Sequence, residues 1–174
     1  MNKAAELLNS EHTVIMSVVN AMKESGIYST ADDKMFEKSI RKLLDFFRNY
    51  ADKYHHHKEE QILFPEMVKK NEMLEDGAIK EMFENHEDFR SLLNNIEDSV
   101  NIFNYNKAHS LLQRYAESLL DHIAVEDDEV FQMMDTLFSP DELDKIYFRF
   151  QDIDNELGLE EKHRWENVAN TFLT

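Results

Sequence analysis

Apolar residues recur along the chain at the three- and four-residue spacing that is typical of amphipathic helices. Between these stretches lie short polar segments, among them the acidic run at 71–77. No stretch shows the strict alternation of apolar and polar residues that a half-buried strand needs. The pattern predicts four long helices, over about residues 3–25, 33–67, 78–100 and 106–138.

Glycine, proline and capping residues mark where the predicted helices begin and end. Gly26 is placed to end the first helix in a left-handed cap, and residues 29–33 offer N-cap candidates for the second. Pro65 predicts a kink near the end of that second helix. Pro140 follows Ser139 as the first residue of a shorter helix, which Gly158 separates from a last amphipathic piece.

Composition agrees with an all-helical chain. Three glycines and two prolines among 174 residues are too few to punctuate many short strands, and 42% apolar residues suffice for a sizeable core. We expect one all-α domain over residues 1–174, with no linker or internal boundary. Its expected architecture is an antiparallel four-helix bundle over about residues 3–138 with a short C-terminal helical extension over about 140–172.

Charge and cysteine content narrow the function. A net charge of −17 repels phosphate backbones and anionic lipid, so we expect neither a nucleic-acid nor a membrane partner. No apolar run reaches the length of a membrane span, and charges near the N-terminus replace the apolar run of a signal peptide, so a cytoplasmic protein is expected. Because the chain has no cysteine, any metal must be held by histidine and carboxylate.

The direction that each histidine faces follows from its position, at about 100° per residue around a helix. The second helix carries three in a row: His55 lies within about 50° of the centre of the apolar stripe, His56 about 150° away, and His57 nearly opposite. The same test on the other helices finds one inward histidine on each. The four inward histidines are His12, His55, His86 and His122. His56 and His57 are interpreted as surface residues, as are Lys58 and Glu60.

Two inward carboxylates accompany these histidines. Glu59 and Glu126 lie four residues after His55 and His122, and therefore one turn further along the same face. A single inward histidine is most often a hydrogen-bonded core residue, but burying two carboxylates without cations costs several kcal/mol each. Four imidazoles and two carboxylates suit two divalent or trivalent metal ions, each with two histidines and sharing the glutamate pair.

With these residues in view, the sequence resembles the hemerythrin-like (HHE cation-binding) family. The strongest stretch, residues 52–65, contains HHHKEEQILFP and resembles the family's His-His-x-Lys-Glu-Glu-x-x-Leu-Phe-Pro signature. Three shorter matches are Glu11-His12, Asn85-His86-Glu87 and the block from Asp121 to Phe131, and the run 139–165 resembles the tail of bacterial members.

The resemblance implies a non-haem di-iron centre of two iron ions joined by an oxo or hydroxo group. It implies His12, His55, His86 and His122 as terminal ligands and Glu59 and Glu126 as bridging ligands. Oxygen-carrying members have a further histidine where this chain has Arg90, so the iron beside His86 is expected to lack a protein ligand. The four-His, two-Glu set resembles that of di-iron proteins linked to iron–sulfur repair and nitrosative stress.

These observations favour a di-iron protein that binds or reacts with a small molecule, namely O2, NO or peroxide. Turnover and reversible binding are both compatible with the ligand set. Two alternatives stay open: a non-catalytic oxygen or redox sensor or iron storage and delivery protein, and a structural metal such as zinc that holds the bundle together.

Overall fold

The computed structural model describes residues 2–24 and 33–172 of the chain. All regular structure in these two ranges is helical. The first helix of the bundle is α1 (Lys3–Glu24) and the third is α4 (Ala78–Asn101), as the apolar spacing predicts. The predicted cap at Gly26 and the N-cap candidates at 29–32 lie outside the described residues.

The second and fourth helices of the bundle are not purely α-helical. Each contains π-helical structure, which carries His55, His56 and Glu59 in the second helix and begins at Glu126 in the fourth, and then returns to an α-helix. The second is α2 (Asp33–Phe46), η1 (Phe47–His56), η2 (Glu59–Leu63) and α3 (Phe64–Lys70), and the short turn η3 (Glu72–Leu74) follows it. The fourth is α5 (Tyr105–Val125), η4 (Glu126–Val130) and α6 (Phe131–Leu137).

Pro65 lies in the first turn of α3, directly after a π-helical segment. Proline is tolerated in a first turn because its missing N–H would have had no partner there. The residue before it, Phe64, donates its N–H to the carbonyl of Glu59, five residues back, which is the π-helical spacing. The chain therefore passes through Pro65 without ending the helix.

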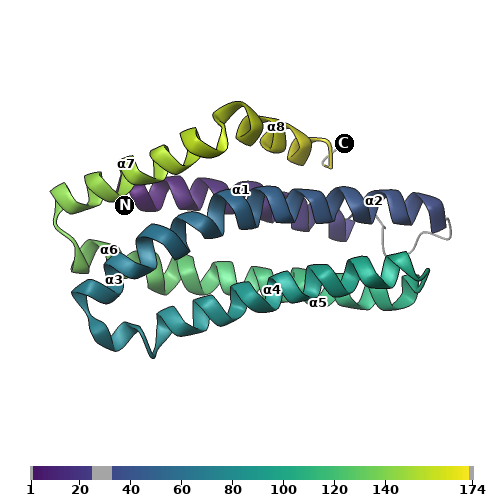
Figure 1. Ribbon diagram of the computed structural model, residues 1–174, viewed down its shortest axis with the longest axis horizontal. Helices are drawn as coiled ribbons and strands as arrows, with labels where there is room; N and C mark the ends of the chain where they lie inside the picture. The colour runs from purple at the N-terminus through teal and green to yellow at the C-terminus, as the bar shows by residue number, and fades with distance from the viewer. Residues whose placement is uncertain (1, 25–32, 173–174) are drawn as a thin grey trace.

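The four long helices run antiparallel, and the C-terminal helices α7 (Pro140–Leu157) and α8 (Leu159–Asn170) lie along one side of the bundle (Figure 1). A capping box between Ser139 and Glu142 begins α7. Gly158, with φ of 101°, makes the corner between the two helices, and an L side chain is strained at this angle. The fold confirms the predicted all-α bundle with a C-terminal extension, and none of the described helices is long and apolar enough to cross a membrane.

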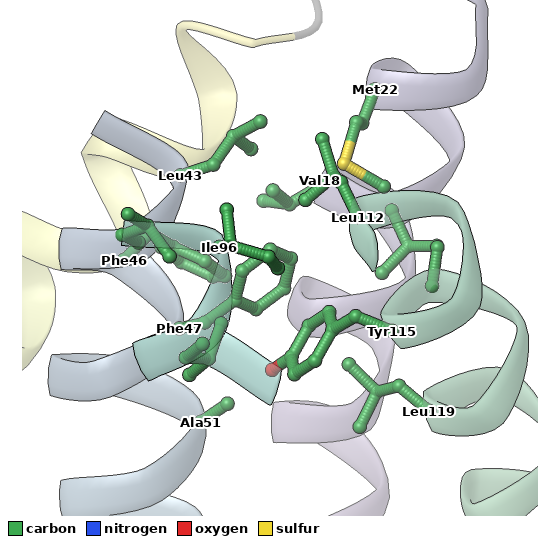
Figure 2. Close-up of a cluster of buried hydrophobic side chains, with 14 of the residues drawn as sticks. Val18, Met22, Leu43, Phe46, Phe47, Ala51, Ile96, Leu112, Tyr115 and Leu119 are labelled. Atoms are coloured by element: carbon green, nitrogen blue, oxygen red, sulfur yellow. The ribbon is translucent and has the colours of Figure 1, made fainter. Parts of the chain in front are cut away.

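Buried apolar side chains form two separate cores. In the larger core, residues of all four long helices point toward one another, among them Val18, Phe47, Ile96 and Tyr115 (Figure 2). The smaller core lies toward the other end of the bundle and also receives residues of α7. Each long helix contributes side chains to both cores. A polar layer lies between the two cores, where the helices pass from one to the other.

Candidate metal centre

Histidine and glutamate side chains fill the layer between the two cores. On α1, His12 lies between Leu8 of the smaller core and Ile15 of the larger one. On α4, His86 lies between Met82 and Phe89 in the same way. Seven such side chains are present, none more than 3% exposed. They form a first cluster (His12, His55, Glu59, Glu126) and a second cluster (His56, His86, His122), and within each cluster the candidate ligand atoms lie within 4.8 Å of one another.

All six side chains predicted from the sequence lie in these two clusters. The seventh residue, His56, was not predicted and groups with His86 and His122. The interpretation of His56 as a surface residue was wrong, because its side chain is buried. The error came from assuming α-helical geometry. From Ala51 to His56, five residues overshoot a full turn by about 140° in an α-helix but by only about 50° at the wider π-helical spacing.

The π-helix therefore lets neighbouring histidines serve different clusters. His55 belongs to the first cluster and His56 to the second, while His57 is exposed. A sequence signal for this was present in the run of three histidines itself, but nothing in the apolar spacing marked the change of helix type. The interpretation of Lys58 as a surface residue was wrong as well, because its side chain is fully buried.

The sequence predicted that a metal beside His86 would lack one protein ligand, but the structure places a further histidine there. The second cluster already contains a third imidazole, that of His56. Arg90 instead makes ion pairs, with Nη2 at 2.7 Å from Oδ1 of Asp52 and 2.7 Å from Oε1 of Glu60. Glu60, predicted at the surface, is thus drawn into contact with the site.

The two glutamates of the first cluster face both clusters. Glu59 lies with Oε1 at 3.4 Å from Nε2 of His55 and Oε2 at 3.6 Å from Nε2 of His86. Oε2 of Glu126 lies 3.2 Å from Nε2 of His12 and 3.2 Å from Nε2 of His122. Each carboxylate can therefore contribute to both clusters at once.

Around the clusters, four of the five histidines donate Nδ1–H to a carboxylate. These contacts leave the Nε2 lone pairs directed inward, the tautomer that a metal ligand needs. The acceptors are Asp127 for His12 at 2.7 Å, Glu11 for His55 at 3.0 Å, Asp52 for His56 at 3.3 Å and Glu60 for His86 at 2.8 Å. Nδ1 of His122 instead lies 3.4 Å from the side-chain amide of Asn85.

Burial controls the protonation of most of these histidines. It lowers the pKa of His55, His56 and His86 to about 3, so these rings are neutral at physiological pH. His12 is the exception: burial alone would lower its pKa, but hydrogen bonds with Asp127 and Glu126 outweigh it and raise the pKa to about 9. In the metal-free protein, His12 therefore carries the positive charge that a metal ion would replace.

The two buried glutamates are driven apart in pKa. Burial and the nearby charge of Glu126 raise the pKa of Glu59 well above its usual value. Burial acts on Glu126 in the same direction, but His122 and His12 outweigh it and hold the pKa of Glu126 well below its usual value. Without a metal, Glu59 therefore favours its protonated form and Glu126 its ionised form.

The inward polar atoms provide a test of whether these residues fit a metal. Nε2 of His55, both carboxylate oxygens of Glu59 and Oε1 of Glu126 are buried without a hydrogen-bond partner. Buried polar groups in native proteins are nearly always paired, so a group of orphaned acceptors needs an explanation. A cation in contact with these atoms would satisfy them together, and the donor set of imidazoles and carboxylates fits a metal.

Comparison with known proteins agrees with the geometry. The family described as Hemerythrin HHE cation binding domain matches residues 3–134, a range that covers more than half of the chain and includes all seven residues of the two clusters. No curated protein and no solved structure matches the chain. The chain belongs to the Hemerythrin HHE cation binding domain family, and its buried His/Glu clusters are consistent with a metal site.

Proposed function

We propose that the protein binds two iron ions in the two clusters and that the pair binds or reacts with a small molecule, O2, NO or peroxide. The observation that carries this proposal is the pair of adjacent buried clusters with Glu59 and Glu126 facing both. In the proposal, Glu59 and Glu126 would help to hold both ions, and the five histidines would bind them through Nε2.

The donor count supports a small-molecule ligand. The first cluster offers two imidazoles and two carboxylates, while the second offers three imidazoles in addition to the same carboxylates. The first cluster thus offers fewer protein donors than the second, so it would leave more room for an exogenous molecule. The ring of Phe131 stacks on His12 with centroids 5.4 Å apart and supplies an apolar wall.

When bound, the iron pair would supply redox chemistry, and the residues of this chain would do the rest. Asp127 and Glu11 would hold His12 and His55 in the tautomer that presents Nε2. Burial of the layer between two apolar cores would exclude bulk water from the reacting molecule. A role in oxidative or nitrosative stress, or in iron–sulfur repair, is the physiological setting that we propose for such a centre.

A non-catalytic role is the second candidate. The ligand set suits reversible binding or iron handling as well as turnover, so an oxygen or redox sensor, or an iron storage or delivery protein, stays open. A structural zinc ion is a further alternative, because the first cluster offers the four ligands of a tetrahedral site.

Metal analysis of protein purified without added metal tests the proposal. We expect about two iron ions per chain, with Mössbauer spectra of a coupled pair. Zinc in place of iron, or a single ion per chain, would contradict the proposal. Anaerobic titration of the reduced protein with O2, NO and peroxide then separates the roles: multiple turnovers support an enzyme, and a stoichiometric reversible adduct supports a carrier or sensor.

A further inference from the structure

Four charged side chains form a closed ring beside the first cluster. Lys58 Nζ lies 2.7 Å from Oε1 of Glu11 and 2.5 Å from Oδ1 of Asp154. Lys162 Nζ lies 2.5 Å from the same Oε1 of Glu11 and 2.6 Å from Oδ2 of Asp154. Each lysine thus pairs with both carboxylates, and the ring, which is buried, is neutral as a whole.

Two of the four ring residues lie outside residues 3–134, the range that the family model matches. Asp154 on α7 and Lys162 on α8 lie beyond residue 134, one helical turn before and one after the corner at Gly158. The positive φ at Gly158 makes the sharp corner that brings both side chains to one place. Tyr54 lies within hydrogen-bond distance of the carbonyls of Leu157 and Gly158, so the corner also contacts the segment that carries His55.

The ring reaches the first cluster through Glu11. Both lysines occupy Oε1 of Glu11, and Oε2 remains to accept Nδ1–H of His55 at 3.0 Å. Asp127 and Asp52, the acceptors for His12 and His56, are about one-third exposed, whereas Glu11 is 1% exposed. The acceptor of His55 is therefore shielded from water, whereas the acceptors of His12 and His56 are partly exposed to it.

We propose that Lys162 and Asp154 are positioning residues of the candidate metal centre. By holding Glu11, they keep His55 in the Nδ1–H tautomer with Nε2 directed at the first cluster, so the C-terminal helices support a site whose seven cluster residues all lie within the family match. This inference rests on the proposed function for its metal, but the orientation of His55 is a property of the chain itself. Partners of this kind typically change metal affinity about 10- to 100-fold.

The test is the full chain carrying Asp154→Asn with Lys162→Met, which removes one anion and one cation from the ring. The matched control is Glu161→Gln with Arg164→Met, which removes an exposed ion pair from α8. Histidine ¹⁵N NMR of the metal-free proteins reports the tautomer of each ring. Zn²⁺ titration, followed at the His55 and His86 rings, reports affinity at each cluster.

We expect the ring variant to show mixed tautomers at His55 and a Zn²⁺ affinity at the first cluster that is about 10- to 100-fold weaker, with the second cluster and the control unchanged. A single Nδ1–H tautomer at His55 with unchanged affinity, or an equal loss at both clusters, would overturn the inference. If the ring variant does not fold, Lys162→Gln is measured in the same way against the same outcomes. Failure of the wild-type chain to bind metal would refute the proposed function, while the tautomer measurement would still decide this inference.

Discussion

Acidification should unfold the metal-free protein unusually steeply, because three neutral histidines are buried in the polar layer. The folded-state pKa values of His55, His56 and His86 are about 3, below the value of about 6.5 for an unfolded histidine. A lowered histidine pKa gives stability that is present above the unfolded pKa and is lost as pH falls toward the folded one. The loss should therefore begin below about pH 6.5.

The expected slope follows from a count of protons. Between pH 6.5 and 4.5, unfolding takes up about three protons at the histidines. Glu59 opposes at most one of them, because a raised folded-state pKa means that unfolding releases a proton from this carboxyl group. The net uptake of about two protons corresponds to about 3 kcal/mol per pH unit, or about 5–6 kcal/mol over the whole range. That loss is comparable to the entire stability of many domains.

Urea unfolding of the chelator-treated protein at several pH values between 6.5 and 4.5 measures this slope. The key variant is His56→Gln, which removes one buried histidine and should lower the slope by about 1.4 kcal/mol per pH unit. The matched control is His57→Gln, at the exposed neighbouring position, which should leave the slope unchanged. Equal stability at pH 4.5 and 6.5, or the same slope in wild type and His56→Gln, would refute the reasoning.

Three further predictions concern single residues. His55→Ala should lose most metal at the first cluster whereas His57→Ala keeps it, as metal analysis after dialysis will show, and equal loss in both would contradict the inward direction of His55. Arg90→Met releases the carboxylates of Asp52 and Glu60 that hold His56 and His86, so Zn²⁺ affinity at the second cluster should fall about 10-fold, and an unchanged affinity would argue against this role. Gly158→Ala places a side chain at φ of 101° and should lower the free energy of unfolding by about 1–2 kcal/mol in urea titrations, and an unchanged stability would contradict the strain assigned to this corner.

The apolar spacing predicted the bundle well because four helices with wide apolar stripes have few other ways to bury them. The first helix begins, and the third begins and ends, close to where the apolar spacing placed them. His12, His86 and His122 lie in the polar layer as predicted, because on α1, α4 and α5 the assumed 100° per residue holds. His55, Glu59 and Glu126 lie there too, although they belong to π-helical segments.

Helix type and long-range pairing could not be predicted in the same way. The π-helical turns that bring His56 inward depend on how the second helix packs against its neighbours, which one local pattern does not contain. The burial of Lys58 depends on Asp154, which lies 96 residues away on a helix of the C-terminal extension. A local pattern that treats each charge as solvated cannot anticipate a partner that only the folded chain brings near.

The division of the interior into two apolar cores bears on how cooperatively the protein folds. Apolar contacts are the main source of cohesion in a domain, and here they stop at a layer that holds ionisable groups. The two ends of the bundle are therefore coupled by the four helices that run through both cores and by the side chains of the polar layer. Metal ions bound by side chains of all four helices would link the larger core to the smaller one. Metal loading would then govern whether the bundle unfolds as one unit or as two.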